Sequence, residues 1–335
     1  MPAPRLGGGG GRNSCKTKKG TVWMVLFIAS NIVWLLIFLS GGLLMDSTIT
    51  TDTYKLLLSG DTTTAIKTTA NPDETIRDTS KNEQQYDKKY WEWQASMNKF
   101  GAAYKGDIIR HILAGMPRKP ETILEFGCSG GYILDSMPVA QKYGVEINPA
   151  ARAHAQTTFP SIQQVFLRPE DIPETLRFDV IYSTSVFEHV DCPLCELRKL
   201  KHKLKDDGIF IVGLKNDGAD PGQEFASRAH DPNHHIYTWN ALLLANMMDS
   251  AGYTPCQSTG QYDAWHNIDV DQYKADKYKY CKTGLAHGKQ NHVQNLWSVS
   301  VNPQAAKALC GQYAARVQEI LDCKYLKLPN NEKYP

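Results

Sequence analysis

A glycine-rich turn in the middle of the chain carries the residues that most clearly suggest chemistry. In the sequence ILEFGCSGGYILDSM, residues 123–137, an apolar run typical of a buried strand leads into the turn, and a helical pattern follows it. Gly127, Gly130 and Gly131 allow a sharp turn and let a ligand approach the backbone without meeting a Cβ atom. The start of the helix adds unpaired N–H groups that bind polar or anionic groups. The stretch therefore predicts a ligand-binding turn.

Two carboxylates beside this turn narrow the choice of ligand. A dinucleotide is not favoured, because Ser129 and Tyr132 stand where the spacing G-x-G-x-x-G needs glycines. Glu125 lies two residues before Gly127, where it suits a ligand with an ammonium group. Glu146 closes a second apolar run 19 residues after Gly127, where it suits hydrogen bonds from two ribose hydroxyls. S-adenosylmethionine carries both groups, so these residues favour it as the ligand.

Four stretches in a fixed order make the chain similar to a known family. The chain resembles the class I S-adenosylmethionine-dependent methyltransferases over roughly residues 86–302. A doubly wound domain that binds another nucleotide is the alternative. The four stretches are LEFGCSGG (124–131), GVEINPAARAHA (144–155), FDVIYSTSVFEHV (178–190) and LKDDGIFIVGLKN (204–216).

The resemblance implies an α/β fold with S-adenosyl-L-methionine as the cofactor. The expected fold is a doubly wound, mostly parallel, seven-stranded Rossmann-like sheet with helices on both faces. Many relatives carry an Asp after the third strand for the adenine, whereas this chain has Arg168 there, which leaves the adenine contact open. Cys128 is also explained as a small buried filler. The residues expected to bind the cofactor are Glu125, Gly127, Cys128, Ser129, Gly130, Gly131, Glu146, Ile147, Glu170, Asp171 and Ser183.

Histidines at two places are candidates for the reaction itself. The sulfonium methyl group is already activated, so the protein has to align an acceptor and, for a hydroxyl acceptor, remove a proton. Glu188 and His189 follow the predicted fourth strand, and His234 and His235 follow the fifth. We expect His235 or His234 to be the general base, with His189 and Glu188 shaping the pocket. His189 is equally explained as a histidine at a helix start.

The Glu188–His189 pair also resembles part of a metal site. The ubiquinone-pathway O-methyltransferases and the small-RNA 2′-O-methyltransferases carry the pattern E-x-x-E-H with a further histidine. Ser185 occupies the first position of that pattern here, so one carboxylate ligand is missing. No metal is therefore predicted, and a site made of Glu188, His189 and either His234 or His235 is the alternative.

The pattern of apolar runs predicts the elements that position these residues. Strands alternate with helices, which indicates a parallel sheet with crossover helices. Residues 86–113 are expected to form one or two helices that cap the cofactor pocket or simply pack. A basic run at 197–205 is interpreted as a helix with a solvated basic face. Strands are expected at 121–126, 143–147, 163–167, 179–183, 208–214 and 296–301, the last antiparallel in the family, and a helix at 238–253.

One segment near the end of the sheet is interpreted as an acceptor-binding insertion. Residues 261–295 are polar, aromatic and too irregular in pattern for a core. The aromatic side chains are expected either to stack on sugar rings or to hold the loop together, and they are Tyr262, Trp265, Tyr273, Tyr278 and Tyr280.

The amino-terminal part has the pattern of a membrane anchor. Residues 21–45 are 25 residues without a charge, which is enough to span a bilayer. Residues 1–20 are basic, and the positive-inside rule leaves them in the cytosol. Residues 46–85 have few large apolar side chains and are expected to be a flexible stem, so the methyltransferase domain at 86–335 would face the lumen. A cleaved signal peptide or a mitochondrial presequence is the alternative.

The eight cysteines are consistent with a lumenal domain. Six of them would lie in an oxidising compartment and are expected to form two or three disulfides, whose pairing the sequence does not give. Cys192 and Cys195 form a C-x-x-C pair, but no second such pair exists in the sequence, so a zinc site is not favoured.

Together these features predict a single-pass type II membrane protein of the Golgi or endoplasmic reticulum that O-methylates a glycan or another small-molecule acceptor. A quinone, lipid or protein side chain is the alternative acceptor, and a non-catalytic binding module is the alternative class. The retained Glu125, Gly127, Gly131 and Glu146 argue against a non-catalytic module. A net charge of +2 gives no general attraction to nucleic acid, so none is expected as a partner.

Overall fold

The computed structural model describes residues 86–216, 235–262, 270–292 and 294–327. The predicted tail, anchor and stem lie outside these ranges, and so does His234. No helix within the described ranges is long and apolar enough to cross a membrane. All elements below belong to one compact unit, Ile76–Pro335.

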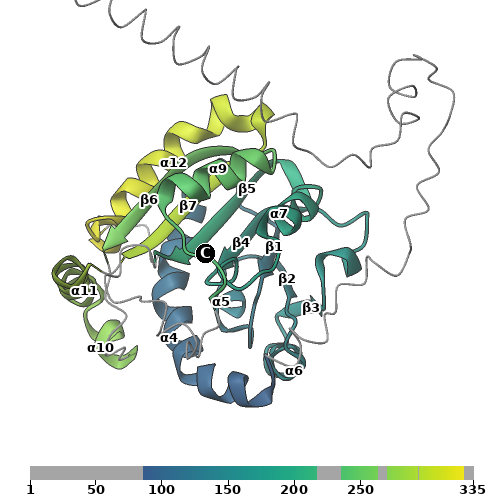
Figure 1. Ribbon diagram of the computed structural model, residues 1–335, viewed down its shortest axis with the longest axis horizontal. Coiled ribbons are helices and arrows are strands. Elements are labelled where there is room, and N and C mark those ends of the chain that lie inside the picture. Colours follow the sequence, from purple (N-terminus) through teal and green to yellow (C-terminus); the bar gives the residue numbers. More distant parts are fainter. Residues whose placement is uncertain (1–85, 217–234, 263–269, 293, 328–335) are drawn as a thin grey trace, which may run out of the picture. The chain divides into compact units, whose positions relative to one another are not determined.

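The described residues form one seven-stranded sheet, in the order β3-β2-β1-β4-β5-β7-β6 (Figure 1). Neighbours from β3 to β5 run parallel, whereas β7 is antiparallel to both β5 and β6. The chain order reverses between β1 and β4, and ligands bind beside the carboxyl ends of the strands at such a point. The strands are β1 Thr122–Phe126, β2 Gln141–Val145, β3 Ile162–Phe166, β4 Phe178–Thr184, β5 Leu204–Lys215, β6 Thr254–Tyr262 and β7 Gln294–Val301.

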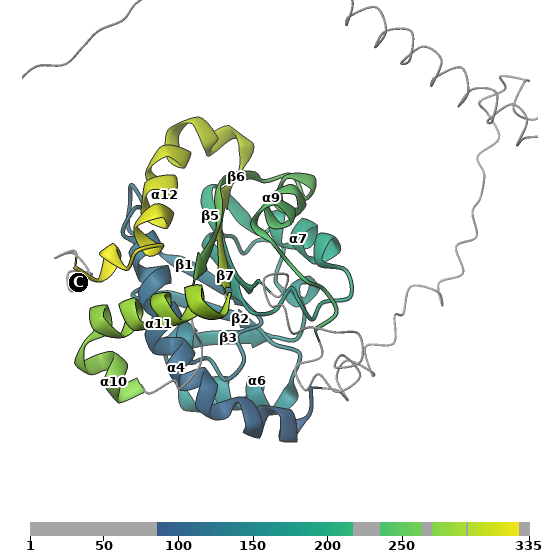
Figure 2. The same cartoon turned by 60° about the vertical axis from the view of Figure 1, so that its left-hand side comes forward.

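Helices cover both faces of this sheet (Figure 2). One apolar core contains residues of α4, α6 and α12, and the other contains residues of α7 and α9. Along β4 the side chains alternate, because Val180 and Tyr182 belong to the first core and Ile181 to the second. The helices are α4 Lys88–Leu113, α5 Tyr132–Asp135, α6 Pro149–Thr158, α7 Pro193–Lys201, α9 Ala241–Ser250, α10 Val270–Ala275, α11 Lys277–Asn291 and α12 Ala306–Ile320, with 3₁₀ turns at Pro169–Asp171, Pro303–Ala305 and Lys324–Lys327.

The predicted strands are present with shifts of a few residues, and the late strand is antiparallel as expected. The region 86–113 forms the single helix α4. The helix predicted over the basic run 197–205 is present only as far as Lys201, where α7 ends, and Leu204 already pairs with Phe178 in the sheet. β6 was not anticipated, since its sequence TPCQSTGQY lacks the apolar alternation of a half-buried strand.

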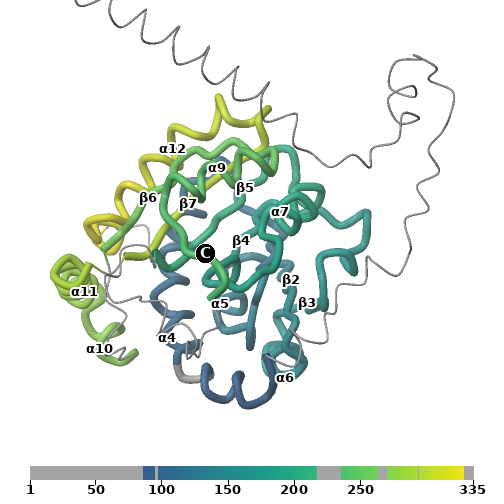
Figure 3. Tube along the Cα trace, in the orientation of Figure 1, coloured from purple at the N-terminus to yellow at the C-terminus, as the bar shows by residue number. Residues whose placement is uncertain are grey.

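The segment 261–295 is more regular than its sequence pattern predicted, while Trp265 lies outside the described residues and the acceptor-binding role stays a prediction. The described part forms the end of β6, two helices, α10 and α11, and the start of β7. The views agree that α10 lies beside α4 (Figure 3), and the Tyr273 hydroxyl donates a hydrogen bond of 2.6 Å to the Asp107 carboxylate of α4. Tyr273 is fully buried, while Tyr278 and Tyr280 pack against the same core. These rings therefore hold the helices in place, and Tyr273 is not accessible to a sugar ring.

Three disulfides confirm the expectation from the cysteine count. They join Cys192 to Cys195, Cys256 to Cys310 and Cys281 to Cys323. Both thiols of the C-x-x-C pair are thus bound to each other, which agrees with the sequence argument against zinc. Cys128 remains a free, buried thiol, as expected of a small filler.

Candidate functional site

The turn after β1 has the backbone that its glycines predict. Gly127, Ser129 and Gly131 have φ angles of 76°, 48° and 83°, a region that favours glycine. The Gly127 and Cys128 N–H groups donate hydrogen bonds of 2.8 and 3.0 Å to the carbonyl oxygen of Val145 on β2. The turn is therefore tied to the end of the neighbouring strand, where the second carboxylate lies.

The glycines also make room for protein side chains. A Cβ atom at Gly127 would lie 2.2 Å from a methyl carbon of Val186, and one at Gly131 would lie 2.8 Å from Ile162. The reason first expected for Gly131, open space for the cofactor, is thus incomplete. Any larger side chain there would meet Ile162 and adopt a strained φ, whether or not a ligand is bound.

Glu146 organises the cofactor turn from the end of β2. Its two carboxylate oxygens accept hydrogen bonds of 2.7 Å each from the backbone N–H groups of Ser129 and Asn148. Burial raises the pKa of this carboxyl group, and the two backbone hydrogen bonds oppose that shift. Each oxygen of a carboxylate can accept more than one hydrogen bond, so the predicted ribose contact remains compatible with this arrangement.

The side chain of Glu125, predicted to contact the ammonium group of the ligand, is almost completely buried. The side chain is 2% exposed and accepts a hydrogen bond of 2.9 Å from the Tyr182 hydroxyl. Burial raises the pKa of Glu125 to about 8, although the Tyr182 bond and the charge of Lys105 lower it. Lys105 itself donates a hydrogen bond of 2.9 Å to the Ser185 hydroxyl. A cationic group of a ligand near Glu125 would favour its ionised form.

The other predicted cofactor residues occupy varied positions. Ser183 is buried and donates a hydrogen bond to the Phe126 carbonyl oxygen, which links β4 to β1. Ile147 is half-buried directly after Glu146. Glu170 and Asp171 are exposed, with Glu170 paired to Lys199 on α7 and Asp171 accepting a hydrogen bond from the Arg168 N–H. The described contacts of these two acids are with the protein, so an adenine contact stays a prediction.

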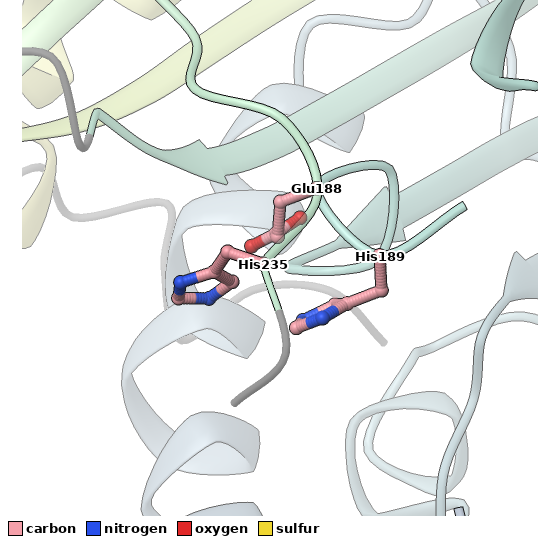
Figure 4. Close-up of side chains that lie close together, drawn as sticks. All are labelled: Glu188, His189 and His235. Atoms are coloured by element: carbon pink, nitrogen blue, oxygen red, sulfur yellow. The ribbon is translucent and has the colours of Figure 1, made fainter. Parts of the chain in front are cut away.

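Three predicted catalytic residues meet at the carboxyl edge of the sheet. Ligand atoms of Glu188, His189 and His235 all lie within 4.8 Å of one another (Figure 4). The two imidazole rings are 4.9 Å apart between centroids. The segment that carries His235 is fastened there, because the N–H groups of Ile236 and Tyr237 both donate hydrogen bonds to the Glu188 carbonyl oxygen. Sequence reasoning placed these loops over one mouth, and the structure brings the side chains together.

The start of α4 packs on the cofactor turn, which the sequence predicted only as one of two alternatives. Trp91 packs on the cofactor turn so closely that a Cβ atom at Gly130 would lie 2.0 Å from its ring. The Asn148 amide donates a hydrogen bond of 3.0 Å to the Asp87 carbonyl oxygen. Helix α4 begins there because the Asp87 side chain accepts a hydrogen bond from the backbone N–H of Tyr90. These contacts favour the capping interpretation of residues 86–113.

Tyr86, which the sequence argument did not single out, lies beside the histidine cluster. Burial is the main reason that the pKa of Tyr86 is raised, and the negative charges of Glu188, Asp191 and Glu146 add to it. The phenol ring is 5.9 Å from the His189 ring. Tyr86 is thus near the predicted ribose carboxylate and near the histidine cluster. The aromatic residues spaced along the start of 86–113 were the available signal.

A depression on the described surface lies away from this site. It has a volume of about 490 Å³ and is lined by Lys119, Glu121, Met137 and Lys142, among others. These residues lie at the amino ends of β1 and β2, whereas the carboxylates, the turn and the histidines lie at the carboxyl ends.

The sheet is parallel except for β7, which is antiparallel to both of its neighbours. Together with a glycine turn after β1 and a glutamate after β2, this sheet defines a Rossmann-like, class I methyltransferase domain. A family model described as a methyltransferase domain matches residues 78–258, more than half of the chain. The chain belongs to this family of S-adenosylmethionine-dependent methyltransferases, whose cofactor is S-adenosylmethionine.

Individual relatives match only part of the chain. A ubiquinone biosynthesis O-methyltransferase of Glaesserella parasuis is 32% identical over 106 residues, which are 28% of this chain and 45% of the relative. A tRNA U34 carboxymethyltransferase of Serratia proteamaculans is 31% identical over 136 residues, 36% of this chain and 41% of the relative. The chain thus spans less than half the length of either relative. A solved S-adenosylmethionine-dependent methyltransferase from Clostridium acetobutylicum is 10% identical with a TM-score of 0.42, and the match covers 59% of this chain and 92% of that one.

Proposed function

We propose that the protein is an O-methyltransferase that transfers the methyl group of S-adenosylmethionine to a hydroxyl oxygen. The gathering of Glu188, His189 and His235 within 4.8 Å is the observation that carries this proposal. The hydroxyl oxygen attacks the methyl carbon, the bond from that carbon to sulfur breaks, and the cofactor leaves as the neutral thioether. A basic imidazole takes the hydroxyl proton, which is the step that a hydroxyl acceptor needs and that histidine supplies near neutral pH.

His235 is the first candidate for this base, and His189 is the second. His235 is half-exposed on the segment that precedes α9, whereas the neighbouring Glu188 is only 1% exposed. In assays with radiolabelled cofactor and a panel of phenols and oligosaccharides, replacement of the base by Gln should lower kcat by about 10²–10⁴-fold. It should also remove the acidic limb of the pH–rate profile. His287→Gln, on the exposed side of α11, is the matched control. Near-normal kcat in both His235→Gln and His189→Gln contradicts a histidine base.

A metal-assisted reaction is the second candidate, and the same cluster favours it. One carboxylate and two imidazoles form a donor set that suits Zn²⁺ or another divalent transition metal better than Mg²⁺. Such an ion would supply a Lewis acid that lowers the pKa of a bound hydroxyl. Calorimetric titration of the chelator-treated protein with Mn²⁺ or Zn²⁺ tests the site without an activity readout. Binding that Glu188→Gln and His235→Gln both abolish supports the metal site, and equal binding by all three proteins refutes it.

The acceptor is proposed to be a hydroxyl on a glycan or on another small molecule such as a phenol. The order of anchor, stem and catalytic domain that the sequence predicts resembles that of Golgi-resident glycan-modifying enzymes, and this supports a glycan. The O-methylation named for the ubiquinone-biosynthesis relatives supports a phenol. The relatives that modify tRNA offer a nucleic acid, which the net charge of +2 does not favour. Comparison of methyl transfer to oligosaccharides, catechols and tRNA in one assay separates these classes.

We further propose that residues 21–45 anchor the protein as a single-pass type II membrane protein with the domain in the lumen of the Golgi or endoplasmic reticulum. The three disulfides support an oxidising compartment. In sealed microsomes the domain should resist protease until detergent is added, while the tail at 1–20 is cut. Digestion of the domain in intact vesicles reverses this topology.

A further inference from the structure

Large apolar side chains that are exposed to solvent occur on two segments near the candidate site. Trp93 and Met97 of α4 are 47% and 37% exposed, and Ile236, next to His235, is 43% exposed. Leu242 and Leu243 follow in the first turn of α9. Single exposed apolar residues are common on proteins, but their concentration on segments that carry or border one site is informative.

The exposed apolar residues of α4, Trp93 and Met97, belong to one stripe along the helix. Residues 90, 93, 97, 100 and 104 are spaced by three or four positions and therefore share a face of α4, and Tyr86 contacts Tyr90 from just before the helix. Phe100 and Tyr104 are buried under Tyr273, whose ring centre is 5.9 and 5.7 Å from theirs. Trp93 and Met97, on the same stripe, are not covered in this way. The stripe thus changes from core to surface as it approaches the site.

Ring contacts connect this surface to the histidine cluster without a break. The centre of the Trp93 ring is 5.7 Å from that of Tyr90, and Tyr90 is 5.0 Å from Tyr86. Tyr86 is 5.9 Å from His189, which is 4.9 Å from His235. An extended ligand could therefore touch the cluster with one end and the exposed part of α4 with the other.

We propose that the acceptor is an amphiphile whose hydroxyl-bearing head reaches the histidine cluster and whose hydrocarbon chain lies on this apolar rim. The apolar rim consists of Tyr86, Tyr90, Trp93, Met97 and Ile236. This inference rests on the proposed O-methyl transfer and names the acceptor class. Burial of each CH₂ group of a chain against such side chains is favourable, by about 0.8 kcal/mol when complete.

The aliphatic members of the apolar rim favour hydrocarbon over a sugar chain. Met97 and Ile236 offer no hydrogen-bonding group of the kind that buried sugar hydroxyls require.

A series of catechols with hydrogen, butyl, hexyl and octyl substituents tests the proposal. The full-length chain is used for every measurement. For the protein without mutations, kcat/KM should rise about two- to four-fold per added methylene group. The upper value corresponds to complete burial of that group. The double variant Trp93→Gln, Met97→Gln should flatten this dependence, whereas Lys99→Gln, an exposed change on the same helix, should preserve it.

Calorimetric binding of the same series in the presence of S-adenosylhomocysteine separates failure of this proposal from failure of the function. Chain-dependent binding without methyl transfer supports the apolar rim and refutes O-methylation of this class. Methyl transfer to catechol with no dependence on chain length supports the function and overturns the apolar rim. Chain-length dependence that the double variant retains also overturns it, and so does length-dependent binding of oligosaccharides that only the double variant loses.

Discussion

The contact between Trp91 and Gly130 gives a sharp test of whether α4 caps the cofactor turn. A Cβ atom at Gly130 would lie 2.0 Å from the far edge of the Trp91 ring, whereas ordinary contact begins at 3.4 Å. The ring would have to retreat by about 1.4 Å, the difference between these distances. Gly130 is not among the glycines with positive φ, so Gly130→Ala introduces overlap without backbone strain.

The expected cost of this overlap follows from measured overpacking in protein interiors. Gly130→Ala should lower the free energy of unfolding by about 1–3 kcal/mol. In a background of Trp91→Ala the overlap is absent, and the same substitution should be neutral or stabilising by about 0.4–1 kcal/mol through the unfolded chain. The double-mutant cycle should therefore give a coupling of about 1–4 kcal/mol, the difference between these two effects. Displacement of Trp91 should also weaken S-adenosylmethionine binding.

Denaturant unfolding of the four proteins, with cofactor titration by calorimetry, measures both effects. Gly101→Ala is the matched control on α4, because its Cβ would meet its nearest neighbour, Ile133, at 3.9 Å. This control should be stabilising by about 0.5–1 kcal/mol, as for glycine in a helix interior. If Gly130→Ala costs the same with and without the Trp91 ring, the capping argument is wrong.

Other consequences of the structure can be measured in the same way. The buried Glu125 holds its proton to a pKa of about 8 against 4.5 in the unfolded chain, so the free energy of unfolding should fall as pH rises from about 5 to 8, and Glu125→Gln should remove this slope in denaturant titrations. If the cofactor ammonium ionises Glu125, binding at pH 7 should release protons, seen as enthalpies that depend on the buffer. Burial lowers the pKa of His111 to about 4, so stability should be lost as pH falls through the window from 6.5 to 4, and His111→Gln should lessen that loss. Removal of the disulfide between Cys256 and Cys310, which are 54 residues apart, should cost about 4 kcal/mol in unfolding experiments.

The sequence by itself determined the family, most strands of the sheet other than β6, and the cofactor turn. Glycines at fixed offsets, the two glutamates and alternating strands and helices are local patterns, and local backbone chemistry dictates them. Positive φ at Gly127 and Gly131 therefore could be predicted from residue types. The buried filler Cys128 and the presence of disulfides followed from composition, although their pairing did not.

Tertiary structure alone decided which distant residues meet. His189 and His235 come together because β4 and β5 are adjacent in the sheet and both loops leave at the same edge. Tyr86, just before α4, lies with its ring centre 5.9 Å from that of His189, and Trp91 of α4 packs on the cofactor turn. Residues 261–295 have a polar sequence, but Tyr273 within them is buried. Asp107 accepts a hydrogen bond from its hydroxyl group, and α4 covers its ring. Burial depends on partners far away in the sequence, and no local pattern contains them.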